Sequence, residues 1–230
     1  MDTSFSGAVA AYGLRLDYDK RFLKYQRIEG DVIKSRSDPR PESYKLNVDS
    51  IKIVDHLSTI DSWRARKEIV RPLIKQSMCQ IRRKRDANGS PTLGLFKPRK
   101  IEEFIIEPDS SGWTQQQLAN LDQTMLFQAT PTEKLEKIPY KFKYRFWCDD
   151  PDCKSHTMSC TDWELAQSYR SWRDEYDEEW ETALRQKYET EMINKLDTHY
   201  YVGTVHRHPT EWIIVGLFYP PYPNVRDLFD

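Results

Sequence analysis

Four side chains that commonly bind metal ions lie close together in the second half of the chain: Cys148, Cys153, His156 and Cys160. Thiolate and imidazole are the ligands that Zn²⁺ prefers, and four of them in a tetrahedron make a closed, structural site. Pro151 lies inside this loop and helps turn the chain back toward an ion. The spacing therefore predicts a zinc site at these four residues. The alternative is a set of buried thiols beside an ordinary loop histidine, and Cys160, just before a helix start, is the ligand that fits least well.

The remaining cysteine, Cys79, lies far upstream, beside the apolar face of a predicted helix. For a lone cysteine at such a position, the expected role is that of a small buried hydrophobic residue. Three clustered cysteines and one distant one fit reduced thiols or metal ligands better than a framework of disulfides.

A second group of chemically useful side chains is His206, Arg207 and His208. Side chains at positions i and i+2 of a strand project on the same side, so the two histidines can act together. Such a trio suits acid–base catalysis, phosphate binding or a metal-assisted hydrolase or nuclease. The alternative is an ordinary polar turn on the surface. The sequence contains no Gly-rich phosphate loop and no GxSxG or HExxH motif that would name a reaction.

Charge is unevenly distributed along the chain, although the net charge is only −1. The charged side chains of residues 64–85 and of one side of residues 140–148 are mainly basic. Those of residues 162–191 are mainly acidic. A basic segment beside aromatic side chains favours a nucleic-acid partner, with Tyr144 or Trp147 stacking on bases. The alternative is that the basic segment pairs with the acidic one, within the fold or across a dimer. The predicted nucleic-acid contacts are Arg64, Arg66, Lys67, Arg71, Lys75, Arg82, Arg83, Lys84, Arg85, Lys141, Lys143 and Arg145.

The elements that must position the cysteine loop are the best marked in the chain. Residues 140–148 alternate aromatic with basic side chains, which predicts a strand. Thr161 and Glu164 form a capping-box pattern, and apolar residues then recur every three or four positions, so we expect a helix over 161–195 with a break near 174–177. A terminal hairpin is expected from residues 199–206 and 211–219.

The first half of the chain has weaker patterns. Strands are predicted at 25–34, with a bulge at Gly30, and at 50–57, 92–96 and 101–107. A helix at 61–85 should bend or divide at Pro72. Residues 108–139 are predicted to be a connector with a short helix at 114–122. They divide the chain into segments 1–107 and 140–230, and the three parts together can form one compact unit. The expected fold is α+β, mainly antiparallel, with a kinked basic helix and one long amphipathic acidic helix.

Composition limits the class of protein. Hydrophobic residues make up 38% of the chain and aromatic residues 13%, which is enough for a core because aromatic side chains bury large areas. No apolar run is long enough to cross a membrane. The N-terminus has no basic segment followed by an apolar stretch, so no secretory signal is expected and the cytoplasm is the expected compartment.

Residues 140–230 resemble a group of prokaryotic proteins with no established activity. The shared features are an aromatic strand ending in Cys148, the Cys153 and His156 loop, Asp162-Trp163-Glu164, and a hairpin with Val202-Gly203, His206-Arg207, Pro209 and Phe218 to Pro221. The segment from Asp38 to Tyr44 is also similar. The resemblance implies that residues 14–57 are the latter part of a small OB-like β-barrel segment. It implies no catalytic residue.

These patterns together predict a nucleic-acid-binding protein, or a binding subunit of a larger complex, with a zinc-stabilised loop. A metal-assisted hydrolase or nuclease that uses the His206–His208 trio is the enzyme alternative. A subunit that contacts only other proteins is the third hypothesis.

Overall fold

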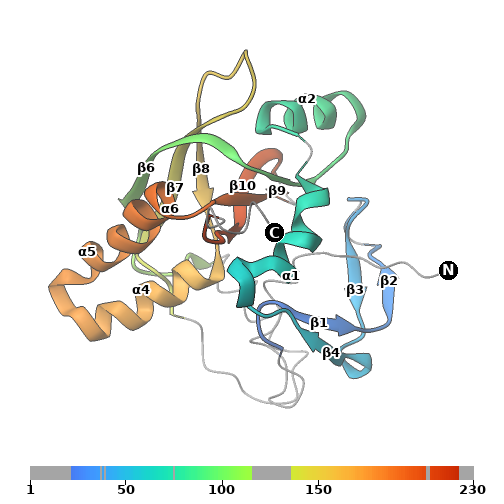
Figure 1. Cartoon of the computed structure of the whole chain (residues 1–230), viewed down its shortest axis with the longest axis horizontal. Helices are drawn as coiled ribbons and strands as arrows, with labels where there is room; N and C mark the ends of the chain where they lie inside the picture. The colour runs from blue at the N-terminus through green and yellow to red at the C-terminus, as the bar shows by residue number, and fades with distance from the viewer. Residues whose placement is uncertain are drawn as a thin grey trace.

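The computed structural model describes residues 22–36, 38, 40–74, 76–115, 136–205 and 208–222. Their centre is a six-stranded sheet in the order β5-β9-β10-β8-β7-β6 (Figure 1). The strands are β5 (Leu93–Phe96), β6 (Pro98–Pro108), β7 (Tyr140–Cys148), β8 (His156–Cys160), β9 (His199–Val205) and β10 (His208–Phe218). All neighbouring pairs are antiparallel except β8 and β10. The predicted α+β class with mainly antiparallel strands is confirmed.

The parallel pair decides which ends of the strands meet. Ile214 of β10 lies opposite Cys160 of β8, and both strands run in the same direction. The beginning of β10 therefore lies at the same end of the sheet as His156, the first residue of β8. The β7–β8 turn is at this end too, because β7 finishes where β8 begins.

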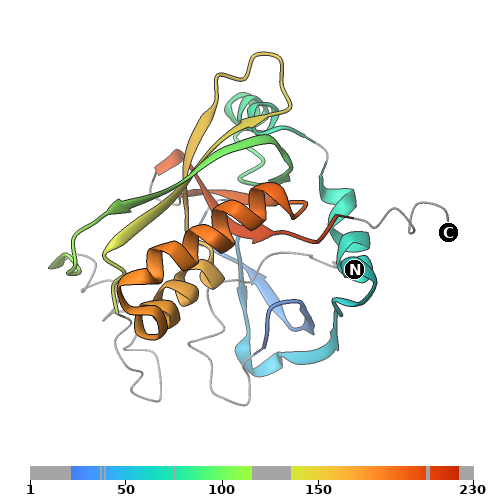
Figure 2. The ribbon, with the colours of Figure 1, turned by 60° about the vertical axis from the view of Figure 1, so that its left-hand side comes forward.

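The acidic segment forms a bent pair of helices rather than one rod. It divides into α4 (Trp163–Tyr176), η5 (Asp177–Glu179), α5 (Trp180–Arg185), the π-helical η6 (Gln186–Glu191) and α6 (Met192–Asn194). Asp177 has φ 47° and ψ −120°, which no helix accommodates, and the chain reverses there. Figures 1 and 2 show α4 and α5 as two arms on the same side of the sheet. The predicted break is confirmed, and the single helix over 161–195 is wrong.

The start of α4 lies one residue later than the capping box predicts. Asp162 is the N-cap, and its carboxylate accepts a hydrogen bond from the backbone N–H of Leu165 at 3.0 Å. A second bond, from the N–H of Leu217 at 2.9 Å, ties the same carboxylate to β10. Thr161 instead donates its hydroxyl to the carbonyl of Ile214. An aspartate serves this role well because it accepts several N–H groups at once.

The basic segment divides at Pro72, as predicted. It comprises α1 (Ile60–Val70), the short η4 (Arg71–Leu73) and α2 (Met78–Asn88). A complete capping box between Ser77 and Gln80 begins α2. Gly89 ends it at φ 71°, a left-handed conformation that glycine adopts without strain. Ile81 then packs against Gly94 of β5, where an added Cβ would lie 2.8 Å from Ile81 Cδ1.

The N-terminal part of the described chain forms two small antiparallel ladders. One joins β1 (Gln26–Glu29) to β4 (Lys52–His56), and the other joins β2 (Val32–Lys34) to β3 (Tyr44–Leu46), with η3 (Val48–Ser50) between β3 and β4. The single strand predicted over 25–34 is therefore wrong, because the chain changes ladders after Glu29. These residues close no barrel within the described ranges, and the OB-like start stays a prediction. Arg40 and Glu42 attach this part to the sheet, through the Thr204 carbonyl and through Thr92.

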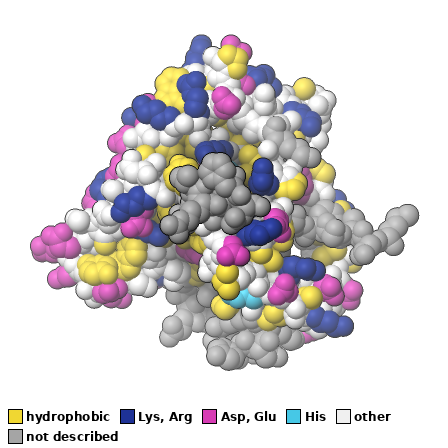
Figure 3. All heavy atoms as spheres, in the orientation of Figure 1, with side chains coloured by type: hydrophobic (Ala, Val, Ile, Leu, Met, Phe, Trp, Pro, Cys, Tyr) yellow, Lys and Arg dark blue, Asp and Glu magenta, His cyan; other side chains and the backbone are white. Residues whose placement is uncertain are grey.

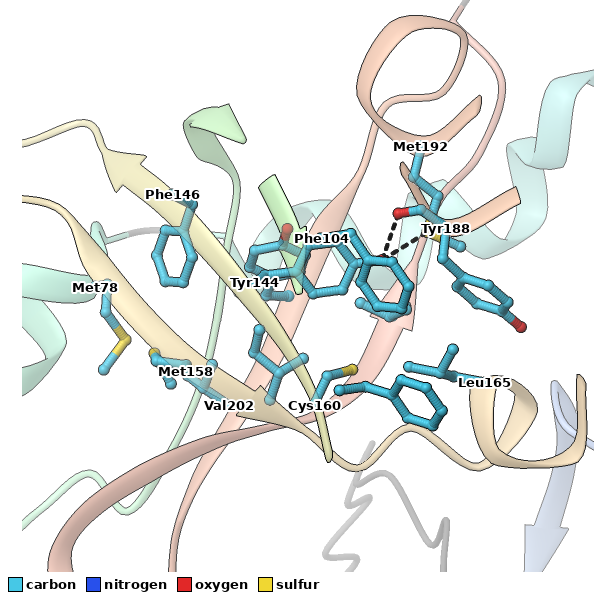
Figure 4. Packing of buried hydrophobic residues seen from close by; sticks show 14 of the residues in the cluster. Met78, Phe104, Tyr144, Phe146, Met158, Cys160, Leu165, Tyr188, Met192 and Val202 are labelled. Atoms are coloured by element: carbon cyan, nitrogen blue, oxygen red, sulfur yellow. Dashed lines mark hydrogen bonds between the residues drawn. The ribbon is translucent and has the colours of Figure 1, made fainter. Parts of the chain in front are cut away.

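The core lies mainly between the sheet and the helices α4 to α6. Phe104, Tyr144, Phe146 and Tyr200 are fully buried within it. Figure 4 shows Tyr144 inside this cluster, with its hydroxyl bonded to the Tyr188 carbonyl at 2.6 Å. The expectation that Tyr144 stacks on bases is wrong, because alternation along β7 turns Tyr144, with Phe142 and Phe146, into the core. A smaller cluster of Val70, Leu95 and Phe218 covers the opposite face.

Two further expectations are limited by the described ranges. The helix predicted at 114–122 falls almost wholly on residues outside them. Among the helices that the structure describes, none has the length and apolar character needed to cross a bilayer.

Candidate metal centre

Three thiols and one imidazole meet at the end of the sheet where β7 turns into β8. They belong to Cys79, Cys148, Cys153 and His156, and their ligand atoms all lie within 4.8 Å of one another. His156 Nε2 is 3.3 Å from Cys79 Sγ and 3.5 Å from Cys148 Sγ. All four cysteines of the chain are free thiols. The site therefore joins ligands from two distant parts of the sequence.

These spacings suit a tetrahedral ion. With Zn–S bonds of about 2.3 Å and Zn–N bonds of about 2.0 Å, the edges of a tetrahedron measure roughly 3.5 Å between sulfur and nitrogen and roughly 3.8 Å between two sulfurs. The two sulfur–nitrogen distances of 3.3 and 3.5 Å are close to the first value. Since all four ligand atoms lie within 4.8 Å of one another, the cluster is compatible with a metal ion.

The β7–β8 turn supplies three of the four ligands. Cys148 is the last residue of β7, and its backbone N–H points to Cys153 Sγ at 3.4 Å. The Cys153 N–H donates to the Asp150 carbonyl at 3.1 Å, which closes the turn. Ser155 adopts φ 74° and redirects the chain, so that His156 opens β8 with its ring toward the thiols.

Helix α2 supplies Cys79 from its first turn. The capping residue Ser77 is also bonded to Asp150, through Ser77 Oγ at 3.3 Å. Arg83, one turn after Cys79, donates to the same carboxylate at 2.5 Å. Asp150 is only 4% exposed and so connects the start of α2 to the turn that carries the other ligands. These bonds from Ser77 and Arg83 to Asp150 fix the position of Cys79 relative to the turn.

The pKa values of the four side chains indicate which of them hold a proton when no ion is bound. Burial raises the pKa of Cys79 to about 12 and also raises the pKa of Cys148. Burial, with the nearby Arg82 guanidinium, lowers the pKa of His156, which keeps the imidazole neutral and able to bind a metal. Three adjacent thiolates repel one another strongly without a positive ion between them, and a divalent ion removes this repulsion.

The predicted ligand set needs one correction. Cys148, Cys153 and His156 come together as expected, but Cys160 does not join them. It lies at the far end of β8, buried between Phe142 and Ile214 of the neighbouring strands, where burial raises its pKa. Cys79 takes its place, although its sequence context predicted a small core residue. A cysteine in the first turn after the Ser77–Gln80 capping box was the signal that could have identified it.

The histidine trio is only partly within the described residues. His206 and Arg207 lie outside them. His208 is exposed at the start of β10, at the same end of the sheet as the metal cluster. The next part of β10 borders a hollow of about 270 Å³ beside the cluster, together with residues of α2 and β8. The hollow is lined by Met78, Arg82, Ser155, His156, Thr157, Met158, Thr210 and Trp212.

Most of the predicted nucleic-acid contacts already have partners within the fold. On β7, Lys141, Lys143 and Arg145 are each paired with a carboxylate, two on β6 and one just after it: Asp109, Glu107 and Glu103 respectively. In α1, Arg66 is 6% exposed and lies over the Tyr25 ring at 3.7 Å. Arg64 pairs with Glu68, Lys67 bonds to the Pro221 carbonyl, and Arg85 pairs with Asp86. Lys75 lies outside the described residues.

A smaller basic group remains around the metal cluster. Arg82 and Lys84 on α2 and Lys154 in the β7–β8 turn are exposed, and none is in an ion pair within the described part of the chain. Arg83 is 56% exposed although it pairs with Asp150. Figure 3 shows Lys and Arg side chains at the top of the molecule, among acidic and hydrophobic ones, where Figure 1 places α2 and this turn. We call Arg82, Arg83, Lys84 and Lys154 the basic end.

Two family models cover most of the chain. One, described as Domain of unknown function (DUF8757), matches residues 74–230. The other, described as Domain of unknown function (DUF8758), matches residues 13–72. All four ligands of the metal cluster, all six strands of the central sheet and the basic end fall within the first match. No curated protein and no solved structure gives a significant match.

Proposed function

The chain belongs to the DUF8757 family, and we propose that it binds nucleic acid through the basic end, which one zinc ion holds in shape. The metal and the partner are both inferred from chemistry. Three sulfur ligands and one nitrogen ligand favour Zn²⁺ over hard cations such as Mg²⁺ or Ca²⁺, which prefer oxygen.

The ligand set also favours a structural role for the ion. Four protein ligands fill a tetrahedral site, and no position then remains for a water molecule or a substrate. A hydrolase needs such an open position. This argues against the alternative in which the ion activates water beside His208.

The observation that carries the proposal is the fixing of α2 by Cys79. The exposed residues Arg82 and Lys84 follow that ligand within two turns of the same helix. An ion that binds Cys79 and the β7–β8 turn therefore sets where these charges point. Rigidly placed Lys and Arg side chains bind phosphates with little loss of side-chain entropy.

The distribution of charge supports an external partner for the basic end. The acidic residues Glu175, Asp177, Glu178 and Glu179 lie at the α4–α5 turn, seen as a magenta group at the left of Figure 3. Within the described ranges, no ion pair joins α2 to residues 162–191. Helix α2 therefore does not pair with the acidic segment within the described fold. The other half of that alternative, pairing across a dimer, stays a hypothesis.

Two matched double variants test the proposal. Fluorescence anisotropy would follow a labelled oligonucleotide, single- or double-stranded, titrated with the zinc-loaded chain at several salt concentrations. The variant R82Q/K84Q removes two unpaired charges, so the slope of log K against log salt should fall by about two on double-stranded DNA. The control K141Q/K143Q removes two charges that are already paired with Asp109 and Glu107, and its slope should stay near that of the wild type.

Two results would contradict the proposal. One is the absence of any binding at low salt by protein whose metal content is complete. The other is an equal loss of affinity in both double variants, because a non-specific effect of net charge would then explain the binding.

A further inference from the structure

The two edge strands of the central sheet differ in how they are protected. Strands β5 and β6 lie at its two ends. β6 has a proline at each end and five charged side chains. At Phe104 its backbone N–H and carbonyl are also covered, by Glu189 at 3.4 Å and by Arg185 at 3.0 Å. Such features prevent another strand from adding to an edge. The sequence of β5, Leu-Gly-Leu-Phe, has none of them.

The register of β5 shows which of its backbone groups face away from the sheet. The N–H of Thr204 donates to the carbonyl of Thr92 at 2.9 Å, and β5 then pairs with β9 without a register shift. Hydrogen-bonded and non-bonded pairs alternate along an antiparallel ladder, so Gly94 bonds to β9, whereas the N–H and carbonyl groups of Leu93 and Leu95 point to the outer edge. Within the described residues, no hydrogen bond joins these outward groups to another part of the chain.

A groove of about 210 Å³ runs along this edge. Its open sides are Leu73 of η4 and Leu93 of β5, which are 41% and 44% exposed, and the exposed Lys84 of α2. Its floor is Ile81 and Leu95, which are 2% and 4% exposed. The other lining residues are Gln76, Pro91 and Gly94. An apolar surface and an unpaired strand edge are therefore accessible at the same place.

The side of the groove next to α2 carries a positive charge. Gly94 faces this helix, because a Cβ added there would lie 2.8 Å from Ile81 Cδ1. Lys84 follows Ile81 by three positions, so it lies on the same side of α2. None of the lining residues is acidic, and Lys84 makes no ion pair with any described residue. A carboxylate from outside is the complement that this side lacks.

The opposite side of the groove is apolar. Alternation along β5 turns Leu93 and Leu95 away from α2. Leu95 packs there with Val70, at the end of α1, and Leu73 follows three residues later. An added strand would place its side chains on these two sides in turn, since side chains of neighbouring strands meet their cross-strand partners on the same face.

We propose that β5 accepts an extended segment of a partner protein as an added strand, in which an acidic side chain lies between two apolar ones. The apolar side chains contact Leu73 and Leu93, and the acidic one pairs with Lys84. Backbone hydrogen bonds to the outward groups of β5 supply affinity, and the alternation of side chains supplies specificity. A second copy of β5 fits less well, because that strand has no acidic residue for Lys84.

A library of random heptapeptides displayed on phage, selected on the zinc-loaded full chain, supplies the probe. We expect the selected peptides to share aspartate or glutamate between two apolar residues. The most frequent peptide is then synthesised with a fluorescent label, and its affinity is measured by anisotropy. Hydrogen exchange followed by NMR should show that the amide of Leu93 exchanges more slowly when this peptide is bound.

Three variants test where the peptide binds. L93P removes an outward N–H but no bond to β9, since proline is tolerated where the N–H of an edge strand faces out, and it should weaken the peptide roughly fivefold or more. K84Q should weaken it about two- to fivefold, as expected for an exposed ion pair. The matched control K154Q removes an exposed lysine that does not line the groove and should leave the affinity unchanged. The K84Q and K154Q pair decides the test if L93P does not fold.

Three results would overturn the inference. Selected peptides without the acidic residue, or equal losses in K84Q and K154Q, would show that the groove does not read this pattern. A wild-type dimer in light scattering that L93P converts to a monomer would assign the edge to a second copy.

The inference does not depend on nucleic-acid binding, and the same variants keep the two apart. Lys84 and Lys154 both belong to the basic end, so both changes should weaken the oligonucleotide, whereas L93P should weaken only the peptide. Failure of the oligonucleotide to bind therefore leaves the peptide result intact, and the reverse also holds.

Discussion

At the scale of single residues, the protonation of the three cysteines determines how the metal cluster binds an ion. Burial raises the pKa of Cys79 to about 12 and raises that of Cys148 as well, so both thiols hold their protons near neutral pH when no ion is bound. Hydrogen bonds from the backbone of the turn outweigh burial at Cys153 and lower its pKa. A metal ion binds only deprotonated sulfur and must therefore displace protons.

This predicts that zinc binding releases about two to three protons per chain at pH 7, chiefly from Cys79 and Cys148. Calorimetric titration of metal-free protein in buffers with different ionisation enthalpies measures that number. His156 adds little, because its lowered pKa leaves it neutral at this pH.

The direction in which zinc affinity changes with pH follows from the protons that the cysteines lose. Zinc affinity should rise with pH between about 6 and 8, since fewer protons have to be displaced per ion as the medium becomes more alkaline. Zinc binding without proton release would mean that the thiols are not the ligands.

The residue scale also shows what the sequence could and could not predict about the site. Cys148, Cys153 and His156 are close in sequence and on a turn, so local spacing was enough to group them. Cys160 was added by the same reasoning, but it lies four positions along extended β8 from His156. An extended strand of that length carries a side chain more than 10 Å away. Cys79 arrives only through tertiary packing, which no local spacing contains.

At the scale of elements, Asp162 links the helices to the sheet. Its carboxylate accepts N–H groups from Leu165 in α4 and from Leu217 in β10, and it is 3% exposed. One side chain therefore caps a helix and fixes that helix against a strand. The Thr161 hydroxyl, in contrast, makes one bond of 3.3 Å at an exposed position.

We predict that D162A lowers the free energy of unfolding by about 2–4 kcal/mol, because a helix cap is lost and a buried N–H is left without an acceptor. T161A should cost less than about 1 kcal/mol. Urea unfolding of the two variants, followed by circular dichroism with zinc present, measures both values. A larger loss of unfolding free energy in T161A than in D162A would show that Thr161 is the N-cap, as the capping-box pattern predicted.

The elements also differ in how well their patterns predicted them. The strand predicted over 140–148 has the bounds that the structure shows, because strict alternation along a half-buried strand identifies it without ambiguity. The acidic helix was only half right. Its apolar period continues through the reversal at Asp177, since both arms bury the same kind of side chain against one sheet. Periodicity alone therefore cannot distinguish a helical hairpin from a rod.

At the scale of the whole molecule, the central sheet collects strands from residues 93 to 218 around one core. Its order β5-β9-β10-β8-β7-β6 requires strands from both sides of residues 108–139. No local pattern predicted this order, because strand pairing depends on contacts between distant residues. The parallel pair β8 and β10 is the important part, since it brings the beginning of β10 to the metal cluster.

The same arrangement separates charge across the molecule. The basic end lies at the metal cluster, and the acidic α4–α5 turn lies away from it at the left of Figure 3. Net charge near zero conceals this separation. We propose that this separation orients the molecule toward a polyanion, and we expect its association with nucleic acid to depend strongly on ionic strength.

The central claim is that one zinc ion joins α2 to the β7–β8 turn through Cys79. Elemental analysis of purified protein, wild type, C79S and C160A, tests it directly. We predict about one zinc per chain in the wild type and in C160A, and a marked loss in C79S, since three ligands hold the ion far less tightly than four. Full zinc in C79S with loss in C160A would contradict the account.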